Sequence, residues 1–154
     1  MSSSITEALL QCELFGKLTE QEVQPISALC QVEQYEVGET VFTQGDRGSK
    51  IHIIKDGQIT LERSVDLGDR KAKVRITTLG RGRAFGCWLA VLGDAHNVMS
   101  SAVCNKKTEV ISVEGPALRS ALKNNPSVGF KVMERLTHML ADRLRGVYGA
   151  MEKL

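Results

Sequence analysis

Apolar residues in the first thirty positions recur with the spacing of a helix. Thr19 and Glu22 have the separation of a capping box, which predicts that a second helix begins directly after Thr19. We therefore expect two short helices within residues 1–31. Their predicted buried faces contain Ile5, Leu9, Leu10 and Leu14 in the first helix and Val23, Ile26, Leu29 and Cys30 in the second.

Between residues 32 and 113 this spacing gives way to short runs of valine, isoleucine, threonine and phenylalanine that are separated by glycines. Asp56-Gly57 lies between two such runs and predicts a hairpin with a tight turn. The polar stretch 65–72 predicts the loop of a second hairpin. Six to eight short strands with no helical period between them indicate a closed antiparallel roll or barrel.

Helical spacing returns after Pro116, where residues 117–123 predict a short helix. Asn125 and Pro126 supply the N-cap and the first position of another helix, which runs to the end of the chain, about 40 Å if unbroken. The whole pattern predicts one α+β domain. It consists of N-terminal helices over 1–31, an antiparallel, jelly-roll-like β-roll over 32–113, and C-terminal helices over 114–154, the last of them long.

Two interleaved series of residues, each spaced by seven, run along this last helix and are typical of a helix that pairs with a second copy. The stripe would alternatively pack on the chain's own roll, which suits the first half of the helix. We expect so long a helix to overrun a small roll, so a homodimer seam is the better interpretation for 137–154, although Gly146 and Gly149 weaken the helix there. The predicted seam contains Met133, Thr137, Leu140, Leu144, Val147 and Met151.

The composition and the N-terminal sequence indicate which classes of protein the chain does not belong to. The 154 residues suit one core, and a net charge of +2 lacks the basic excess of a nucleic-acid binder. No stretch reaches the roughly 18 apolar residues of a membrane span. The N-terminus, Met1–Ser4, lacks the basic and apolar regions of a signal peptide, so we expect a cytoplasmic protein.

Few residues suggest catalysis or metal binding. The four cysteines, Cys12, Cys30, Cys87 and Cys104, form no C-x-x-C pair, so we expect reduced, mostly buried thiols and no metal site. No glycine–serine elbow, H-E-x-x-H motif or Walker-type loop occurs, and nothing near Cys87 in the sequence resembles a base. We therefore do not expect an enzyme.

The order of the elements and seven short motifs resemble the cyclic nucleotide-binding domain, which is the sensor of catabolite activator-type bacterial regulators and of cAMP-dependent kinase regulatory subunits. Each motif is weak alone, but their order and spacing over essentially the whole chain are specific. The motifs are Val-Gly-Glu-Thr-Val-Phe at 37–42, Gln-Gly-Asp at 44–46, Ile-Lys-Asp-Gly-Gln-Ile at 54–59, Ala-Phe-Gly at 84–86, Ser-Ala-Val at 101–103, Thr-Glu-Val at 108–110 and Ala-Asp-Arg-Leu at 141–144.

The resemblance implies a phosphate-binding cassette over 84–103. In the family, a short helix after the Phe-Gly pair presents its amides to the cyclic phosphate, a glutamate binds the ribose and an arginine pairs with the phosphate. This chain has Cys87 at the glutamate position and Ser100 at the arginine position, and its stretch 93–99 is longer than usual. We therefore expect weak binding of cAMP or cGMP, or binding of another small anion at the cassette amides.

The resemblance also implies the ligand-binding residues. Arg83 and His96 are further candidates for a positive charge, and Tyr148 for stacking on a planar ligand. Each has an alternative: a solvated strand face for Arg83, an exposed loop for His96 and the dimer seam for Tyr148. The alternative for Trp88 is packing in the core, and the alternative for Ser100 and Ser101 is hydrogen bonding to nearby backbone. The cassette candidates are Phe85, Gly86, Cys87, Trp88, Leu89, Ala90, Ser100 and Ser101.

Two functions of different classes follow. The first is a regulatory domain that senses a small ligand and signals through its C-terminal helix. The alternative is a vestigial domain that no longer binds ligand and serves as a scaffold for dimerisation or protein interaction. The expected partners are a second copy of the chain, a small molecule and a downstream protein, without a membrane. Direct DNA binding is not expected because the sequence stops at Leu154, where such regulators continue into a helix-turn-helix.

Overall fold

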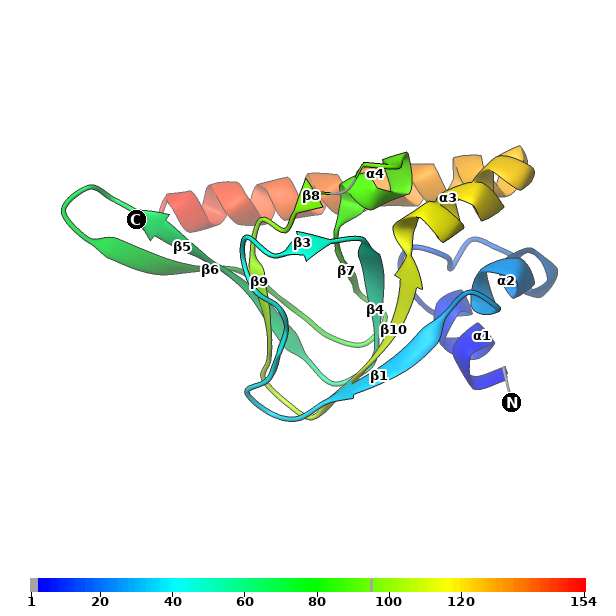
Figure 1. The fold of residues 1–154 in the computed structure, drawn as a ribbon, viewed down its shortest axis with the longest axis horizontal. Coiled ribbons are helices and arrows are strands. Elements are labelled where there is room, and N and C mark those ends of the chain that lie inside the picture. Colours follow the sequence, from blue (N-terminus) through cyan, green and yellow to red (C-terminus); the bar gives the residue numbers. More distant parts are fainter. Residues whose placement is uncertain (1–2, 95) are drawn as a thin grey trace.

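The computed structural model describes residues 3–94 and 96–154 and has the predicted α+β architecture. Thr19 and Glu22 form the predicted capping box, since Thr19 Oγ1 accepts from the Glu22 N–H at 3.1 Å and Glu22 Oε1 accepts from the Thr19 N–H at 2.9 Å. Figure 1 shows the N-terminal helices at one end of the molecule and the C-terminus at the other. The helices are α1 (Ser3–Leu10), α2 (Glu20–Ser27), α3 (Gly115–Asn124) and α4 (Pro126–Met151).

Within the described residues, ten strands form two four-stranded antiparallel sheets and one two-stranded ribbon, which together make the predicted roll. One sheet has the order β1, β10, β4, β7; the other has the order β2, β9, β5, β6; β3 pairs with β8. A short 3-10 helix, η1 (Trp88–Leu92), follows β7. The strands are β1 (Gln31–Tyr35), β2 (Thr40–Phe42), β3 (Arg47–Gly48), β4 (Lys50–Asp56), β5 (Ile59–Asp66), β6 (Lys71–Leu79), β7 (Ala84–Gly86), β8 (His96–Asn97), β9 (Ser101–Cys104) and β10 (Thr108–Glu114).

The prediction of a hairpin at Asp56-Gly57 is wrong. β4 pairs with β10 and β7, whereas β5 pairs with β9 and β6, so this turn carries the chain from one sheet to the other. Buried Thr108 of β10 holds the crossing, because its Oγ1 accepts from the Gln58 N–H at 3.2 Å. The local turn signal is the same for a hairpin and for a crossing, and only the long-range partners of the strands distinguish them.

β5 and β6 form the second predicted hairpin, but the strands extend into the stretch expected to be its loop. Their pairing runs from Ile59 opposite Leu79 to Asp66 opposite Lys71, which leaves only residues 67–70 for the turn. The polar residues of this stretch therefore belong to a solvated strand ladder. The hairpin reaches beyond the rest of the roll, beside the C-terminal end of α4 (Figure 1).

The alternation of side chains along β4 divides the core in two. Ile51 and Ile53 face the helices and pack with apolar residues of all four. Ile54 faces the interior of the roll, where it belongs to a cluster that includes Phe85 of β7. His52 shares this inner side, because its ring stacks on Phe85 with a centroid distance of 5.1 Å. The inner face of the roll thus carries a polar ring among its apolar side chains.

The long helix does not overrun the roll, contrary to the expectation from its length. Gly146 permits a close approach to β6, because a Cβ there would lie 3.2 Å from the Ile76 carbonyl oxygen. The β5–β6 hairpin extends the surface that the helix covers, so helix length alone does not argue for a dimer seam. The buried positions of α4 are Val128, Val132, Leu136, Met139 and Ala150.

The predicted start of the last helix is also confirmed. Asn125 caps α4, with its Oδ1 3.4 Å from the Val128 nitrogen, and Pro126 is the first residue of the helix. All four cysteines are free, and three of them are buried. In the part of the chain that the structure describes, no helix is long and apolar enough to span a membrane, and no three His, Cys, Asp or Glu side chains gather as metal ligands would.

Candidate ligand-binding site

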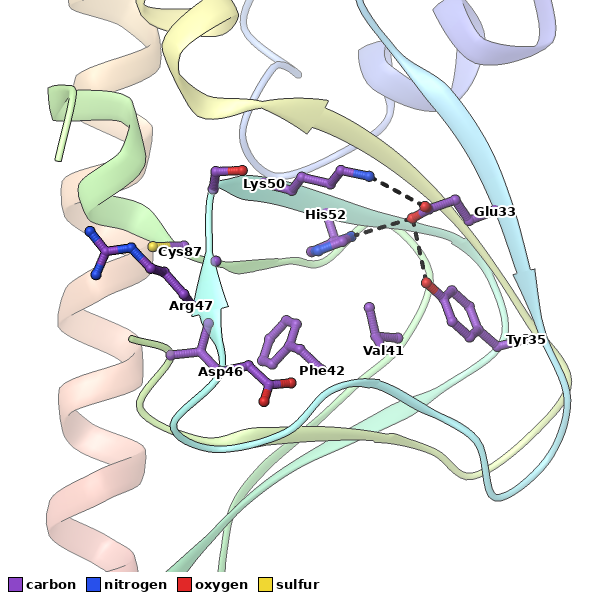
Figure 2. Close-up of a pocket in the computed structure, with 12 residues that line it drawn as sticks. Glu33, Tyr35, Val41, Phe42, Asp46, Arg47, Lys50, His52 and Cys87 are labelled. Carbon is purple, nitrogen blue, oxygen red and sulfur yellow. Dashed lines mark hydrogen bonds and ion pairs between the residues drawn. The ribbon is translucent and has the colours of Figure 1, made fainter. Parts of the chain in front are cut away.

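Two neighbouring cavities open inside the roll and share part of their walls. The helix-side cavity, of about 390 Å³, lies between β7, the segment that follows it and α4. The strand-side cavity, of about 290 Å³, is bounded by β1, β2, β3 and β4 (Figure 2). Phe42, Cys87 and Val98 line both. The helix-side cavity is the one that contains the predicted cassette.

The cassette begins at the end of β7, as the resemblance implies. Gly86 has φ +136°, and a Cβ there would lie 2.6 Å from the Lys50 carbonyl oxygen, so the position requires glycine. The Cys87 N–H donates to the same carbonyl at 3.1 Å, and the Ala90 N–H donates to the Cys87 carbonyl at 3.2 Å. Two of the amides expected to receive an anion at 86–90 are therefore already bonded.

Six of the eight cassette candidates line the helix-side cavity, and His96 joins them. Ala90 is instead buried beside Cys87 and Val98. The Ser101 hydroxyl accepts from the Gln44 N–H at 2.9 Å, which is the backbone-bonding alternative. The six that line the cavity are Phe85, Gly86, Cys87, Trp88, Leu89 and Ser100, of which Trp88 also packs on the helix-facing core.

Arg83 and Tyr148 do not line this cavity. The Arg83 Nε donates to Glu13 Oε2 at 2.9 Å, so its charge is paired with the segment after α1 and not offered to a ligand. Tyr148 is exposed on α4. Neither residue therefore lies where the sequence suggested, because Arg83 is held by Glu13 and Tyr148 faces solvent.

Arg143 of α4 is a cation of the site that the sequence analysis missed. Its side chain is 11% exposed, and among the described residues it is the only lysine or arginine lining the helix-side cavity. Its Nη2 donates to the Ala84 carbonyl and lies 3.6 Å from Glu13 Oε2, whereas its Nε has no hydrogen-bond partner within residues 3–94 and 96–154. Burial lowers its pKa from the usual value, but a guanidinium stays charged.

The rest of the lining is mostly apolar and comes from elements far apart in the sequence. Leu61 of β5 and Ile76 of β6 face Leu140, Leu144 and Val147 of α4 across the cavity. An apolar cavity with one buried cation suits a ligand that has a flat or apolar body and one anionic or hydrogen-bond-accepting group. The signal for Arg143 was present in the Ala-Asp-Arg-Leu motif, which indicated the fold but not a role in the site.

The two predicted seam series lie side by side on α4 and differ in how far they are buried. One series is partly buried, since Met133 and Leu140 pack against the helix-facing core and Val147 lines the cavity. The other series is exposed and consists of Thr137, Leu144 and Met151. This second series is the more exposed of the two, although Leu144 also lines the helix-side cavity.

Comparison with known proteins agrees with this geometry. A family model described as the cyclic nucleotide-binding domain matches residues 32–125. A CRP-like cAMP-activated global transcriptional regulator of Mycobacterium tuberculosis is 27% identical over 139 residues, which are 90% of this chain and 58% of the regulator. The chain spans about half the length of the curated bacterial regulators it matches, from 46% to 58%.

Solved structures show the same fold. A cyclic nucleotide-binding domain from Methylobacillus flagellatus superposes with a TM-score of 0.80 at 23% identity, covering 99% of this chain and 84% of that one. The regulatory subunit of a cAMP-independent protein kinase A from Trypanosoma cruzi, bound to guanosine, gives a TM-score of 0.77 at 15% identity, covering 99% and 50%. The family match extends over more than half of the chain and includes the cassette. The chain therefore belongs to the cyclic nucleotide-binding domain family.

Proposed function

We propose that the chain is a ligand-sensing regulatory domain that binds a cyclic nucleotide weakly, or another small anionic ligand, in the helix-side cavity and signals through α4. One observation carries the proposal: Arg143 is buried at the cavity wall, and its Nε has no hydrogen-bond partner among the residues that the structure describes. A buried donor without a partner costs about 1–3 kcal/mol, so a ligand group that accepts from this nitrogen gains that much. The Mycobacterium tuberculosis relative, described as cAMP-activated, supports the regulatory role.

The lining indicates how the ligand differs from one that binds the usual cassette. Cys87 and Ser100 are neutral, and each lost charged hydrogen bond is worth about 1.5–3 kcal/mol, so together they weaken cyclic nucleotide binding by roughly two to four decades. Arg143 offsets part of this loss, because it supplies a positive charge to the same cavity. The guanosine-bound relative from Trypanosoma cruzi supports the inference that such a fold holds a nucleoside without a cyclic phosphate.

Arg143 also links the ligand to the signal. Its guanidinium contacts Glu13 and the Ala84 carbonyl, and it therefore ties α4 to two other parts of the chain. A ligand that draws the guanidinium toward the cavity weakens these contacts and changes how α4 packs. Because a ligand shifts an equilibrium only by its difference in affinity for the two states, this competition is the step that converts binding into a signal.

Calorimetric titration with cAMP, cGMP and guanosine tests the proposal. Arg143→Ala should weaken binding of whichever ligand the wild type binds by about tenfold or more. Arg145→Ala is the matched control, because Arg145 lies two residues further along α4, is 77% exposed and pairs with Asp142 at 2.6 Å. Equal affinity in Arg143→Ala and wild type would exclude Arg143 as the ligand's partner.

An exposed apolar strip on α4 favours a second candidate, a scaffold that pairs through this helix with a second copy of the chain. Leu144 and Met151 are 55% and 58% exposed, Tyr148 lies between them in the sequence, and Leu154 follows three residues after Met151. Large apolar side chains repeated at intervals of three and four are typical of a coiled-coil seam. Failure of all three nucleotides to bind, together with a stable dimer, would favour this candidate over the sensor.

A further inference from the structure

The strand-side cavity is a polar site lined by no residue of α4, and Cys87 is the one cassette candidate among its lining residues (Figure 2). Its volume of about 290 Å³ is at the lower end of the roughly 300–1,000 Å³ of small-molecule pockets, so it suits a small ligand. Its lining includes Glu33 and Tyr35 of β1, Val41 and Phe42 of β2, and Lys50 and His52 of β4.

Three polar groups converge on the Glu33 carboxylate without contacting it closely. Lys50 Nζ lies 3.5 Å from Oε2, the Tyr35 hydroxyl lies 3.5 Å from Oε1, and His52 Nδ1 lies 3.9 Å from Oε1. Charge-assisted hydrogen bonds are normally about 2.7–2.9 Å long, so the carboxylate retains most of its capacity to accept. A hydroxyl group placed here can donate to Glu33 while it accepts from Lys50 or Tyr35.

His52 is the observation that points to a ligand. It is 6% exposed, and its Nδ1 has no hydrogen-bond partner in the described part of the chain, although buried polar atoms are nearly always bonded. Stacking on Phe85 at 5.1 Å and a tilted contact with Phe42 at 5.8 Å fix the ring, and Figure 2 shows it directed toward Glu33. Burial, assisted by Lys50, lowers its pKa to about 4, so at neutral pH the ring offers hydrogen bonding and no charge.

The charges around the cavity select the kind of ligand. Glu33 and Asp46 are balanced by Arg47 and Lys50, so the charged lining sums to zero. An anion attracted by Lys50 would also face Glu33, and a cation attracted by Glu33 would face Lys50 at a similar distance. A neutral ligand avoids both repulsions, and hydroxyl groups match a lining that mixes donors and acceptors.

We propose that the strand-side cavity is a second ligand site, which binds a small neutral polyhydroxylated molecule such as a monosaccharide through Glu33, Tyr35, Lys50 and His52. Val41 and Phe42 would support the carbon side of the sugar ring. The proposal does not depend on the function proposed above, because none of the four polar residues lines the helix-side cavity. The two sites still adjoin, since the Lys50 carbonyl accepts from the Cys87 N–H.

Titration of the ¹⁵N-labelled full chain with D-ribose, D-glucose and myo-inositol, followed by NMR, tests this site. We expect at least one of them to give saturable shifts at the Glu33, Lys50 and His52 amides. Glu33→Gln and Tyr35→Phe should each weaken that binding by about tenfold. Glu109→Gln is the matched control, because Glu109 pairs with Lys55 at 2.7 Å in the same sheet but does not line the cavity.

Three results would overturn the proposal. The first is that none of the three sugars gives saturable shifts. The second is that the shifts persist unchanged in both Glu33→Gln and Tyr35→Phe, of which Tyr35→Phe removes a single hydroxyl and should fold normally. The third is that the shifts are lost in Arg143→Ala but kept in the two strand-side variants, which would place the sugar in the helix-side cavity.

Discussion

Arg143 and Glu13 are distant in the sequence, yet Arg143 Nη2 lies 3.6 Å from Glu13 Oε2. The same carboxylate oxygen accepts from Arg83 Nε at 2.9 Å and from the Ala84 N–H at 2.7 Å. One largely buried carboxylate therefore joins the segment after α1, β7 and α4 where the cassette begins. This junction makes the N-terminal segment part of any movement of the long helix.

Glu13→Ala should lower the free energy of unfolding by about 3 kcal/mol, because it leaves buried Arg143 without its opposite charge. Urea denaturation measures the loss. Glu7→Ala, on the exposed face of α1, is the control and should change stability by less than about 0.5 kcal/mol. A Glu13→Ala variant as stable as the control would show that the junction contributes little.

Cys87→Glu combined with Ser100→Arg should raise the affinity for cAMP by about tenfold or more, because it restores both charged contacts of the cassette. Calorimetry on the wild type and the double variant measures the gain. A Cys87→Gln, Ser100→Gln variant is of similar size without charge and should not show it. Submicromolar binding of cAMP by the wild type would contradict the interpretation that the cassette is degenerate.

Leu144→Glu should shift the protein toward monomer, because a carboxylate cannot be buried unpaired in an apolar seam. Sedimentation velocity over a range of concentrations measures the change. Val37→Glu is a suitable control, since Val37 is also an exposed apolar residue but lies in the turn after β1, away from α4. A wild type that stays monomeric at high concentration would exclude the seam.

His52 makes stability depend on pH. Its folded-state pKa of about 4 is below the ordinary 6.5, so the unfolded chain takes up a proton first and stability falls as the pH is lowered from about 6.5 toward 4. Between pH 7 and pH 5 we expect a loss of about 2 kcal/mol from this residue in urea denaturation. His52→Phe should remove that loss.

The groups facing the His52 ring in this cavity are Glu33 and Lys50. Three other carboxyl groups also have a lowered pKa, on Glu22, Asp56 and Glu109. Their protonation reduces the stability of the fold only when the pH falls below the ordinary pKa of a carboxyl group, so their effect lies at lower pH than that of His52. His138→Phe, which alters an exposed histidine of α4, should retain the loss between pH 7 and pH 5. An unchanged pH dependence in His52→Phe would show that His52 is not its source.

Two glycines of α4 should respond oppositely to alanine. At Gly149 nothing lies within 4 Å of a Cβ, so Gly149→Ala should stabilise the protein by about 1 kcal/mol through helix propensity. At Gly146 the new Cβ would press on the Ile76 carbonyl oxygen, so the gain should be cancelled or reversed. Thermal unfolding by circular dichroism compares the two. Equal stabilisation would mean that α4 does not pack closely on β6.

The sequence predicted what depends on local pattern. The capping box at Thr19, the cap at Asn125 and the strand region all follow from neighbouring residues, and the structure contains each of them. The prediction of a hairpin at Asp56-Gly57 was wrong because turn residues do not specify which strands pair across the roll. The prediction that α4 extends beyond the roll was wrong because the β5–β6 hairpin is longer than the sequence indicated.

The site was predictable only in part, for a similar reason. The cassette candidates are contiguous with a recognisable motif, and six of them do line the cavity. Arg143 could not be placed there from the sequence, since its position depends on how α4 docks against β7. The strand-side residues Glu33 and His52 carried no motif at all, because they meet only once β1 and β4 are brought close on either side of β10.

The crossing at Asp56-Gly57 has a consequence for how the chain folds. β1 cannot pair until β10 is present, because Gln31 pairs with Ser112, and β4 also waits for β10 and β7. Neither sheet can therefore assemble from one continuous stretch of chain. Loop closure must precede most of the pairing, and topologies of this kind fold in about milliseconds to seconds. During synthesis on a ribosome, β1 remains an unpaired edge until most of the chain has emerged.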